Sequence, residues 1–304
     1  MLLAVTHSGK FHADDVLSWS LLQYFFPQTY TLTRTRDEEV FAKADIIFDV
    51  GGIFDQQNCK FDHHQHDYTG PYSSAGMLLE WLLQTKKISS GLYEHLKIEL
   101  VDYVDDVDNG RVKPQKGQPD FTTMIDCYNE GCSSLEEYDS AFKKASGMAY
   151  DIVQSLVLRY QNLQRNILIV KAEMDLAIQQ KRNFLFFPDY VSWKDAYFSI
   201  NPYHSSEFII YPSLQGNWTT VAIPPNFNSF DQKKPLPKHW AGYMGDEIIE
   251  ITGKSSAIFC HKNRFICAFS NLVEMIDALV EENMIHHPNI KDWIAQIQPS
   301  RKTS

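Results

Sequence analysis

The sequence predicts an α/β protein, in which a parallel sheet flanked by helices is followed by a smaller α+β domain. Over the first 110 residues, short apolar or alternating segments typical of strands take turns with segments typical of helices. This alternation connects parallel strands through helices that cover the faces of the sheet. From about residue 184, strand-like segments are separated by Gly, Pro and Asn, which indicates a second domain of mixed type.

The first domain is expected to alternate four strands with four helices. Strands are predicted at 2–6, 29–35, 45–52 and 59–67. Helices are predicted at 14–26, 38–44, 73–84 and 90–110. The first helix has acids in its first turn and Pro27 after its end, and Ser73 or Ser74 is the expected N-cap of the third.

A long helical region leads to the second domain. Residues 135–183 have apolar side chains at three- and four-residue spacings. Strands of the second domain are predicted in the segments "NFLFFPD", "EFIIYPS", "WTTVAIPP", "SAIFCHKN" and "FICAFS". The segment "EMIDALVEEN" is expected to close the domain as a helix.

The composition is that of a globular protein long enough for two domains. Of the 304 residues, 44% are hydrophobic and 22% are charged, and the formal net charge is −10. The negative charge of the protein disfavours extensive contacts with a phosphate backbone. It does not prevent the binding of a nucleotide, or of a short nucleic acid end that cations hold. Gathered carboxylates that bind cations are one source of such acidity.

The cysteines and the first residues indicate a reduced, intracellular protein. The five cysteines are odd in number and form no C-x-x-C pair, which argues against a disulfide framework and a zinc knuckle. No apolar run reaches the length of a membrane span, and "MLLAVTHSG" has the pattern of a first strand rather than a signal peptide. We therefore expect a cytoplasmic protein that does not bind membranes.

Polar residues gather where the predicted elements begin and end. The clusters are His7-His12-Asp14, Asp49, Asp62-His63-His64 and residues 105–110. Each has an ordinary structural explanation when taken alone, because aspartates often cap helices and turns. Parallel sheets, however, bind ligands beyond the carboxyl ends of their strands, where His7, Asp49 and His63 are expected.

The chemistry of these side chains predicts a site for two metal ions. Imidazole and carboxylate together suit manganese, iron or zinc. Several carboxylates carry too much negative charge for one divalent ion, whereas two ions that share a carboxylate balance it, as in phosphoryl-transfer sites. The chain has no G-x-S-x-G elbow and no Walker-type loop, so a serine hydrolase or a P-loop protein lacks support.

Five short motifs follow one another along the chain: "HSGKFHADD", "FDVGG", "FDHHQ", "SSAG" and "VDDVDNG". Together they closely resemble the melanocyte-proliferating-gene (MYG, UPF0160-type) protein family, within the DHH phosphoesterase superfamily. "PLPKHWAGYMGDEIIEITG" and "AIFCHKNRFICAF" extend the resemblance to most of the chain. It implies a DHH-like metal-binding catalytic domain at 1–135, a helical connector at 136–183 and an α+β substrate-binding domain at 184–304.

The resemblance also implies two metal sites that share one carboxylate, that of Asp49. The first site consists of His7, His12 and Asp49. The second consists of Asp14, Asp49, His63 and Asp105. The wider superfamily usually has an aspartate where His12 stands, and the histidine removes a negative charge, which leaves the metal preference open.

Further roles are expected around these ligands. His64 matches a histidine that contacts the phosphate and assists the leaving group, so His64 and Asp49 are the expected catalytic residues. Asp108 is the alternative to Asp105 as a ligand, because residues three apart can share a helix face. Asp15 is favoured as a charge at the start of a helix, and Asp62 as a residue that orients His63 or His64.

The second domain is expected to hold the substrate. His261 and Arg264, with Lys262 between them, lie between two predicted strands, where cationic side chains could bind a phosphate or a nucleic acid backbone. The alternative for this segment is an ordinary exposed hairpin turn. Trp240 could stack on a base or belong to the core.

The resulting functional hypothesis is a metal-dependent phosphodiesterase in which two ions activate water. MYG-type proteins are associated with 3′–5′ exonuclease action on RNA, which implies a single-stranded RNA or short oligonucleotide substrate. Mn²⁺ is the most expected ion, with Mg²⁺, Fe²⁺ or Zn²⁺ as alternatives. The other hypotheses are a small-nucleotide phosphodiesterase, phosphatase or pyrophosphatase, and a non-catalytic regulator that binds metal or nucleotide. The oligomeric state stays open.

Overall fold

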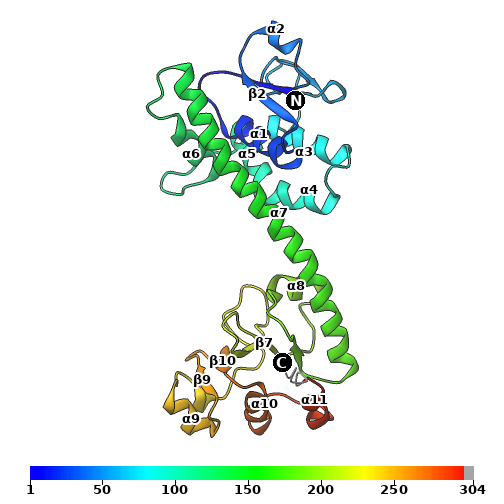
Figure 1. The fold of residues 1–304 in the computed structure, drawn as a ribbon, viewed down its shortest axis with the longest axis vertical. Coiled ribbons are helices and arrows are strands. Elements are labelled where there is room, and N and C mark those ends of the chain that lie inside the picture. The colour runs from blue at the N-terminus through cyan, green and yellow to red at the C-terminus, as the bar shows by residue number, and fades with distance from the viewer. Residues whose placement is uncertain (298–304) are drawn as a thin grey trace, which may run out of the picture. The chain divides into compact units, whose positions relative to one another are not determined.

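The chain folds into two compact units, Met1–Gln161 and the part from Asn162 onward. This computed structural model describes residues 1–297. Figure 1 shows each unit as a sheet with helices packed on it, so the predicted α/β class is confirmed. Helix α7 (Leu135–Gln179) runs through the boundary between the units. The three-part division at 135 and 183 stays a prediction.

The first unit contains a five-stranded sheet in the order β2-β1-β3-β5-β4. Its strands are β1 (Leu2–Thr6), β2 (Tyr30–Arg34), β3 (Ile46–Phe48), β4 (Phe54–Asp55) and β5 (Lys60–Phe61). β1 pairs in parallel with β2 and β3, and β3 pairs in parallel with β5, as the alternating pattern predicts. The edge strand β4, which the sequence did not indicate, is antiparallel to β5, because one short helical turn joins the two strands.

Neighbouring residues of a strand point to opposite faces of this sheet, and helices cover the two faces unequally. Ala4 and Phe48 belong to a large core shared with α1 (Ala13–Phe25) and α3 (Ser74–Gln84). On the other face, Val5 and Ile47 pack with residues in and around the short α2 (Glu38–Phe41).

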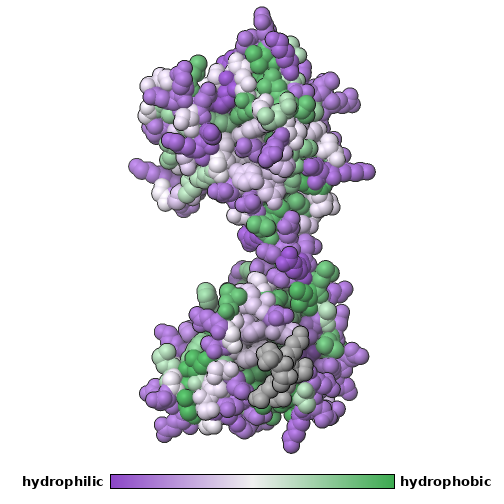
Figure 2. Space-filling model, viewed as in Figure 1, coloured by the Kyte–Doolittle hydropathy of each residue, from purple (hydrophilic) through white to green (hydrophobic). Residues whose placement is uncertain are grey.

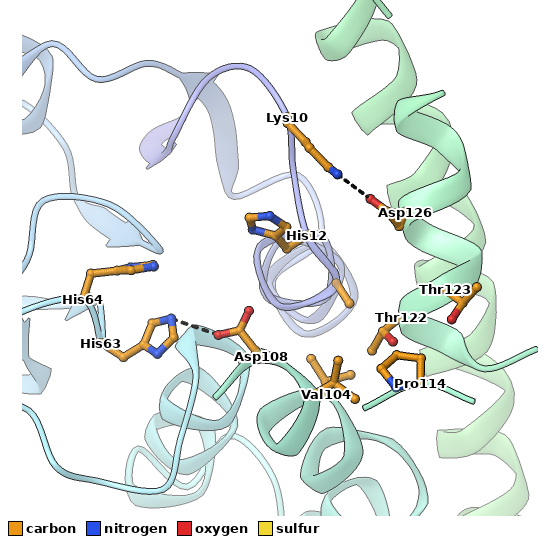
Figure 3. A pocket seen from close by; sticks show the side chains of 12 residues that line it. Lys10, His12, His63, His64, Val104, Asp108, Pro114, Thr122, Thr123 and Asp126 are labelled. Carbon is orange, nitrogen blue, oxygen red and sulfur yellow. Dashed lines mark ion pairs between the residues drawn. The ribbon is translucent and has the colours of Figure 1, made fainter. Parts of the chain in front are cut away.

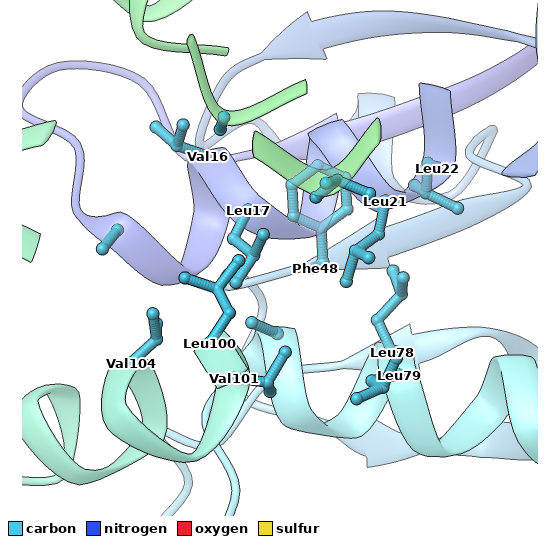
Figure 4. Packing of buried hydrophobic residues seen from close by; sticks show 14 of the residues in the cluster. Val16, Leu17, Leu21, Leu22, Phe48, Leu78, Leu79, Leu100, Val101 and Val104 are labelled. Carbon is cyan, nitrogen blue, oxygen red and sulfur yellow. The ribbon is translucent and has the colours of Figure 1, made fainter. Parts of the chain in front are cut away.

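The large core brings the helices together on one face of the sheet. Figure 4 shows leucines of α1 facing Leu78 and Leu79 of α3, with Leu100, Val101 and Val104 beside them. Leu17, Leu78 and Val104 have no exposed surface. Burying such a side chain stabilises the fold by about 1.5–3 kcal/mol, so this packing fixes where the helix ends lie.

The predicted helix over 90–110 forms, but it is not a uniform α-helix. It consists of α4 (Ser90–Leu96), a π-helical turn (Lys97–Val101) and α5 (Asp102–Asp108). A π-helical turn takes in an extra residue and therefore changes which side chains of the next turns face the core. The short helix α6 (Phe121–Asp126), which the sequence did not indicate, follows with Asp120 as its N-cap.

The second unit contains a mixed five-stranded sheet in the order β6-β7-β8-β10-β9. The strands are β6 (Phe184–Phe186), β7 (Phe208–Pro212), β8 (Trp218–Ala222), β9 (Ala257–Cys260) and β10 (Ile266–Phe269). β6 and β7 are parallel, and the other pairs are antiparallel. All five strands lie in the segments predicted for them, and the α+β class is confirmed.

Helices cover both faces of the second sheet. They are the end of α7, α8 (Trp193–Ile200), α9 (Asp246–Thr252), α10 (Leu272–Glu281) and α11 (Ile290–Ile297). Trp240 has 1% of its surface exposed and packs in the core, so of its two interpretations the structural one holds.

The visible surface of each unit is mainly hydrophilic, with small hydrophobic areas scattered over it (Figure 2). Among residues 1–297, no helix combines the length and the apolar character that a membrane span requires.

Candidate metal centre

The three predicted strand-end residues meet at one edge of the first sheet. His7 follows β1, Asp49 follows β3, and His63 comes two residues after β5. β1, β3 and β5 are adjacent and parallel, so their carboxyl ends lie side by side. The polar cluster at the start of the chain is therefore explained by the topology of the sheet.

Asp49 lies at the centre of the cluster. Its Oδ2 is 3.1 Å from His7 Nε2, and its Oδ1 is 3.7 Å from His63 Nε2 and 3.5 Å from His64 Nδ1. Asp49 Oδ1 is buried and has no hydrogen-bond partner among the described residues. A buried carboxylate oxygen without a partner is costly, and a cation between it and the histidines would compensate for that cost.

The backbone of Asp49 takes an uncommon conformation, with a φ of +54°. A non-glycine residue in this left-handed region costs on the order of 1 kcal/mol and usually occurs where surrounding structure enforces it. Its amide donates to Phe61 O at 3.0 Å, which holds the residue against β5. Gly51, with a φ of +97°, continues the tight turn that a side chain would strain.

The start of α1 supplies a second carboxylate, Asp14, which is completely buried. Its Oδ2 accepts a hydrogen bond of 2.8 Å from Ser74 Oγ, while its Oδ1 is buried without a partner in the described part of the chain. Burial raises the pKa of Asp14 well above its ordinary value, and the neighbouring charges of Asp49, Asp108 and Asp15 raise it further. Such an accumulation of like charges fits a site that takes up cations.

Asp15 has two roles, one of which was expected. Its Oδ1 accepts from His12 N at 2.9 Å, which caps the start of α1. Its Oδ2 lies 3.2 Å from His7 Nε2, the nitrogen that also faces Asp49, so the same carboxylate belongs to the cluster. Burial would lower the pKa of His7, but the hydrogen bonds with Asp15 and Asp49 and their charges raise it to about 10. In the metal-free protein, a proton on His7 thus offsets part of the negative charge.

Among residues 1–297, four groups of side chains have ligand atoms close enough to hold one ion, each within 4.8 Å of the others. They are His7-His12-Asp49, Asp49-His63-His64, His12-Asp14-Asp108 and Asp14-Asp15-Asp49. Three of the four groups contain Asp49. Five of the six predicted ligands, all except Asp105, are therefore brought together.

Asp105 is not placed as a candidate ligand, although it was the first choice from the sequence. Its Oδ1 accepts hydrogen bonds from Ser73 N, Ser73 Oγ and Gly76 N, at 2.9, 2.6 and 3.2 Å. Asp105 is absent from the groups that the described residues form, whereas Asp108, one turn further along α5, lies 3.1 Å from His63 Nε2. Asp105 thus caps α3 through Oδ1, while its Oδ2 is buried without a partner among the described residues. Of the two aspartates only Asp108 belongs to a candidate ligand group, so we favour Asp108, and the choice stays a prediction.

His64 faces solvent beside the cluster, with 62% of its side chain exposed. Asp62 accepts from His64 N and lies 2.7 Å from His64 Nδ1 through the same oxygen, while its other oxygen accepts from Gly52 N. Asp62 therefore ties the loop after β5 to the loop after β3. The hydrogen bond with Asp62 raises the pKa of His64, against the effect of burial.

Two cavities flank the cluster within the first unit. One, of about 710 Å³, has His12, His63, His64 and Asp108 on one side (Figure 3). The other, of about 550 Å³, is lined by His7, Asp49 and Arg36 among others. Volumes of this size are typical of small-molecule sites.

His261 and Arg264 lie in the second unit, in the turn between β9 and β10. His261 N donates to Ile266 O and Arg264 N donates to His261 O, which is the hydrogen-bond pattern of a hairpin. Arg264 has a φ of +59°. Their role in substrate binding stays a prediction.

Comparison with known proteins gives the chain its family. The sequence profile described as "MYG1_exonuc: Uncharacterised protein family (UPF0160)" matches residues 3–282. This chain belongs to that family. The resemblance inferred from the motifs is thereby confirmed.

Relatives of the chain include bacterial and animal proteins. The MYG1 protein of Chlamydia muridarum is 34% identical over 282 residues, which cover 90% of this chain and 94% of that protein. The MYG1 protein of Chlamydia pneumoniae is 32% identical over 269 residues, 88% of this chain and 91% of that protein. The MYG1 exonuclease of Homo sapiens is 28% identical over 308 residues, 86% and 80% of the two chains.

The comparison with solved structures includes a bacterial protein that aligns with the chain over much of its length. It is RecJ in complex with Mn²⁺ from Thermus thermophilus, aligned over 94% of this chain and 53% of that chain. The TM-score is 0.27 and the identity is 11%.

Proposed function

We propose that the chain is a metal-dependent phosphodiesterase that removes nucleotides from the 3′ end of RNA. Its animal relatives are named exonucleases. The observation that supports hydrolysis most directly is the position of Asp49. Its carboxylate is buried, one oxygen lacks a partner, and three candidate ligand groups share it.

The ligands divide into two sets that meet at Asp49. The first set consists of His7, His12 and Asp49. The second consists of Asp14, Asp49, His63 and, in place of Asp105, Asp108. Two divalent ions would offset the buried carboxylates, and the mixture of imidazole and carboxylate favours Mn²⁺ over an all-oxygen Mg²⁺ site.

Two such ions, when bound, supply the Lewis acidity that activates a water molecule and stabilises the phosphoryl oxygens. The chain itself fixes the geometry. Ser74 holds Asp14 through Oδ2, and the carbonyl of Ser8, 3.2 Å from His7 Nδ1, holds the His7 ring with Nε2 facing Asp49. Asp62 holds His64 at Nδ1, which leaves Nε2 directed to other partners. A raised pKa favours protonated His64, which can donate to a phosphoryl oxygen or to the leaving oxygen.

The same ligands could serve a small-nucleotide phosphodiesterase. The cavity of about 710 Å³ next to them has room for a nucleotide, and the net charge of −10 gives no broad attraction for a polyanion. His261 and Arg264 are proposed to hold the phosphates of a longer strand, which a dinucleotide would not need. The length of the preferred substrate therefore distinguishes an exonuclease from a small-nucleotide phosphodiesterase.

The experiment is hydrolysis of a 5′-labelled single-stranded RNA with Mn²⁺, resolved by size over time. A dinucleotide and pyrophosphate are assayed in parallel. The proposal predicts a ladder that shortens from the 3′ end and disappears with chelator. Cleavage of the small substrates alone would move the function to nucleotide turnover. The absence of hydrolysis with all three would leave a non-catalytic binding protein.

A further inference from the structure

The cavity of about 710 Å³ has two chemically different sides (Figure 3). One side carries the candidate ligands His12, His63 and Asp108, together with His64. The other side, which we call the α6 wall, consists of Thr122, Thr123 and Asp126 of α6. Asp126 belongs to none of the candidate ligand groups of the described residues. The proposed metal chemistry therefore leaves the α6 wall without a function.

The α6 wall presents hydrogen-bond acceptors to the cavity. Thr122 Oγ1 and Thr123 Oγ1 donate to the two carboxylate oxygens of Asp120, at 2.6 and 2.9 Å. Their protons are thus engaged, and the lone pairs stay available. Asp126 adds a carboxylate, and carboxylates that are not protonated only accept hydrogen bonds. A ligand on this wall must therefore bring donors.

An exposed ion pair joins Asp126 to Lys10, which belongs to the loop between His7 and His12. Lys10 Nζ lies 3.1 Å from Asp126 Oδ1. Both side chains are more than half exposed, at 56% and 55%, so a ligand can reach them. The ion pair contributes little to stability at such exposure. It occupies one carboxylate oxygen, while Oδ2 has no described partner and can accept from a ligand.

The floor between the two sides is partly apolar. Val107 is half-buried and Pro114 is exposed, so both have surface that a ligand can contact, while Val104 is completely buried behind them. An apolar floor beside a few directed polar groups is typical of a small-molecule site. It suits the flat faces of a base or of a sugar ring better than it suits a phosphate.

We propose that this cavity binds the terminal nucleoside of the RNA strand, and that Asp126 accepts hydrogen bonds from its free 2′- and 3′-hydroxyls. The inference rests on the proposed function. A carboxylate that binds ribose hydroxyls is a known solution in nucleotide-binding proteins. The scissile phosphate then lies toward His63, His64 and Asp108, on the opposite side of the same cavity.

This arrangement would explain why hydrolysis starts at the 3′ end and why RNA is preferred to DNA. A free vicinal diol occurs in a linear RNA strand only at its 3′ end, and the 2′-hydroxyl distinguishes RNA from DNA. One carboxylate that reads the diol would select the 3′ terminus and the ribose together. The wall needs no contact with the base edge, so the base itself would not be discriminated.

The first test measures binding without turnover. The Mn²⁺-loaded protein is titrated with 5′-AMP, 2′-deoxy-AMP and 3′-deoxy-AMP, by calorimetry. We expect each deoxynucleotide to bind about tenfold more weakly than AMP, because a hydrogen bond to a charged group is lost. Asp126→Ala removes both hydrogen bonds, so it should weaken AMP binding about 100-fold and abolish the difference among the three. Met124→Ala, on the exposed side of the same helix, is the matched control and should change nothing.

The second test measures turnover of 5′-labelled RNA strands that end in a ribo-, 2′-deoxy- or 3′-deoxynucleotide. Asp126→Ala should raise KM for the ribose end and leave kcat within a few-fold, because Asp126 does not contact the reacting phosphate. Equal binding of the three nucleotides by the wild type, or no AMP binding, would overturn the inference even if the RNA ladder forms. Clear AMP preference without any hydrolysis would instead overturn the proposed function and leave the diol site standing.

Discussion

Ser74 Oγ donates a hydrogen bond of 2.8 Å to Asp14 Oδ2 across 60 positions of sequence, at a place where both residues are completely buried. The bond joins the first turn of α3 to the first turn of α1. It occupies one oxygen of Asp14 and leaves Oδ1 for a cation. The "SSAG" motif is thereby explained, because Ser73 binds Asp105 in the same way.

Ser74→Ala should weaken Mn²⁺ binding by about 10–100-fold, the usual effect of removing a residue that orients a metal ligand. Titration calorimetry with Mn²⁺ measures this. Ser90→Ala, an exposed serine near the start of α4, is the control. Unchanged affinity in the Ser74 variant would show that Asp14 needs no orientation from α3.

Asp14→Asn should change how the metal-free protein responds to pH. The folded-state pKa of Asp14 is raised by burial and by neighbouring carboxylates. Asp14 therefore contributes stability that is fully present below its unfolded pKa of about 4 and is lost as pH rises through the folded pKa. In EDTA, the variant should gain stability relative to the wild type as pH increases from 5 to 9. Urea unfolding at several pH values measures this, and a constant difference would contradict the assignment.

Substitutions of Asp105 and Asp108 should affect different properties. The first should reduce the stability of the fold, and the second should weaken the binding of Mn²⁺. Asp105→Ala removes three hydrogen bonds at the start of α3 and should cost about 2 kcal/mol of unfolding free energy while the protein still binds Mn²⁺. Asp108→Ala should leave the stability in EDTA within about 0.5 kcal/mol and weaken Mn²⁺ binding at least tenfold. The reverse pattern would restore Asp105 as the ligand.

Arg34 should stabilise the loop that carries His7 and His12. Its guanidinium donates to Gly9 O and to Asp139 Oδ1, both at 2.7 Å, and stacks on Phe142. Arg34→Met keeps the apolar contact but leaves Gly9 O without this donor, at a cost of about 1.5–3 kcal/mol. Chemical unfolding measures it, with Arg36→Met, an exposed neighbour, as the control. Equal effects of the two variants would refute the special role of Arg34.

The ends of the strands could be predicted from the sequence, because strands that alternate with helices along a chain form a parallel sheet, and this alternation is visible in local patterns. Apolar runs bounded by helical segments gave β1, β3 and β5, and their order along the chain placed His7, Asp49 and His63 at one sheet edge. The motifs then gave the family, which the profile match confirms.

Other features depend on contacts that no local pattern contains. The π-helical turn at Lys97–Val101 changes the phase of the following helix, so spacing alone did not distinguish Asp105 from Asp108. Asp15 looked like a helix-start charge, and only the fold shows that its second oxygen reaches His7. The α6 wall was missed because a six-residue helix after a loop has too few residues for a periodic signal.

The central claim is that two metal ions share the carboxylate of Asp49, and substitutions of this residue test it most directly. Asp49→Asn removes the charge and tolerates the left-handed backbone better than alanine, and Asp49→Ala removes the ligand altogether. The measurement is bound metal after gel filtration in Mn²⁺, taken together with hydrolysis of the 5′-labelled RNA, with the exposed Asp67→Asn as the control. We expect both Asp49 variants to keep their circular dichroism spectrum and to lose metal and hydrolysis together. Hydrolysis at the wild-type rate, with two ions still bound per chain, would contradict a shared carboxylate at the centre of the site.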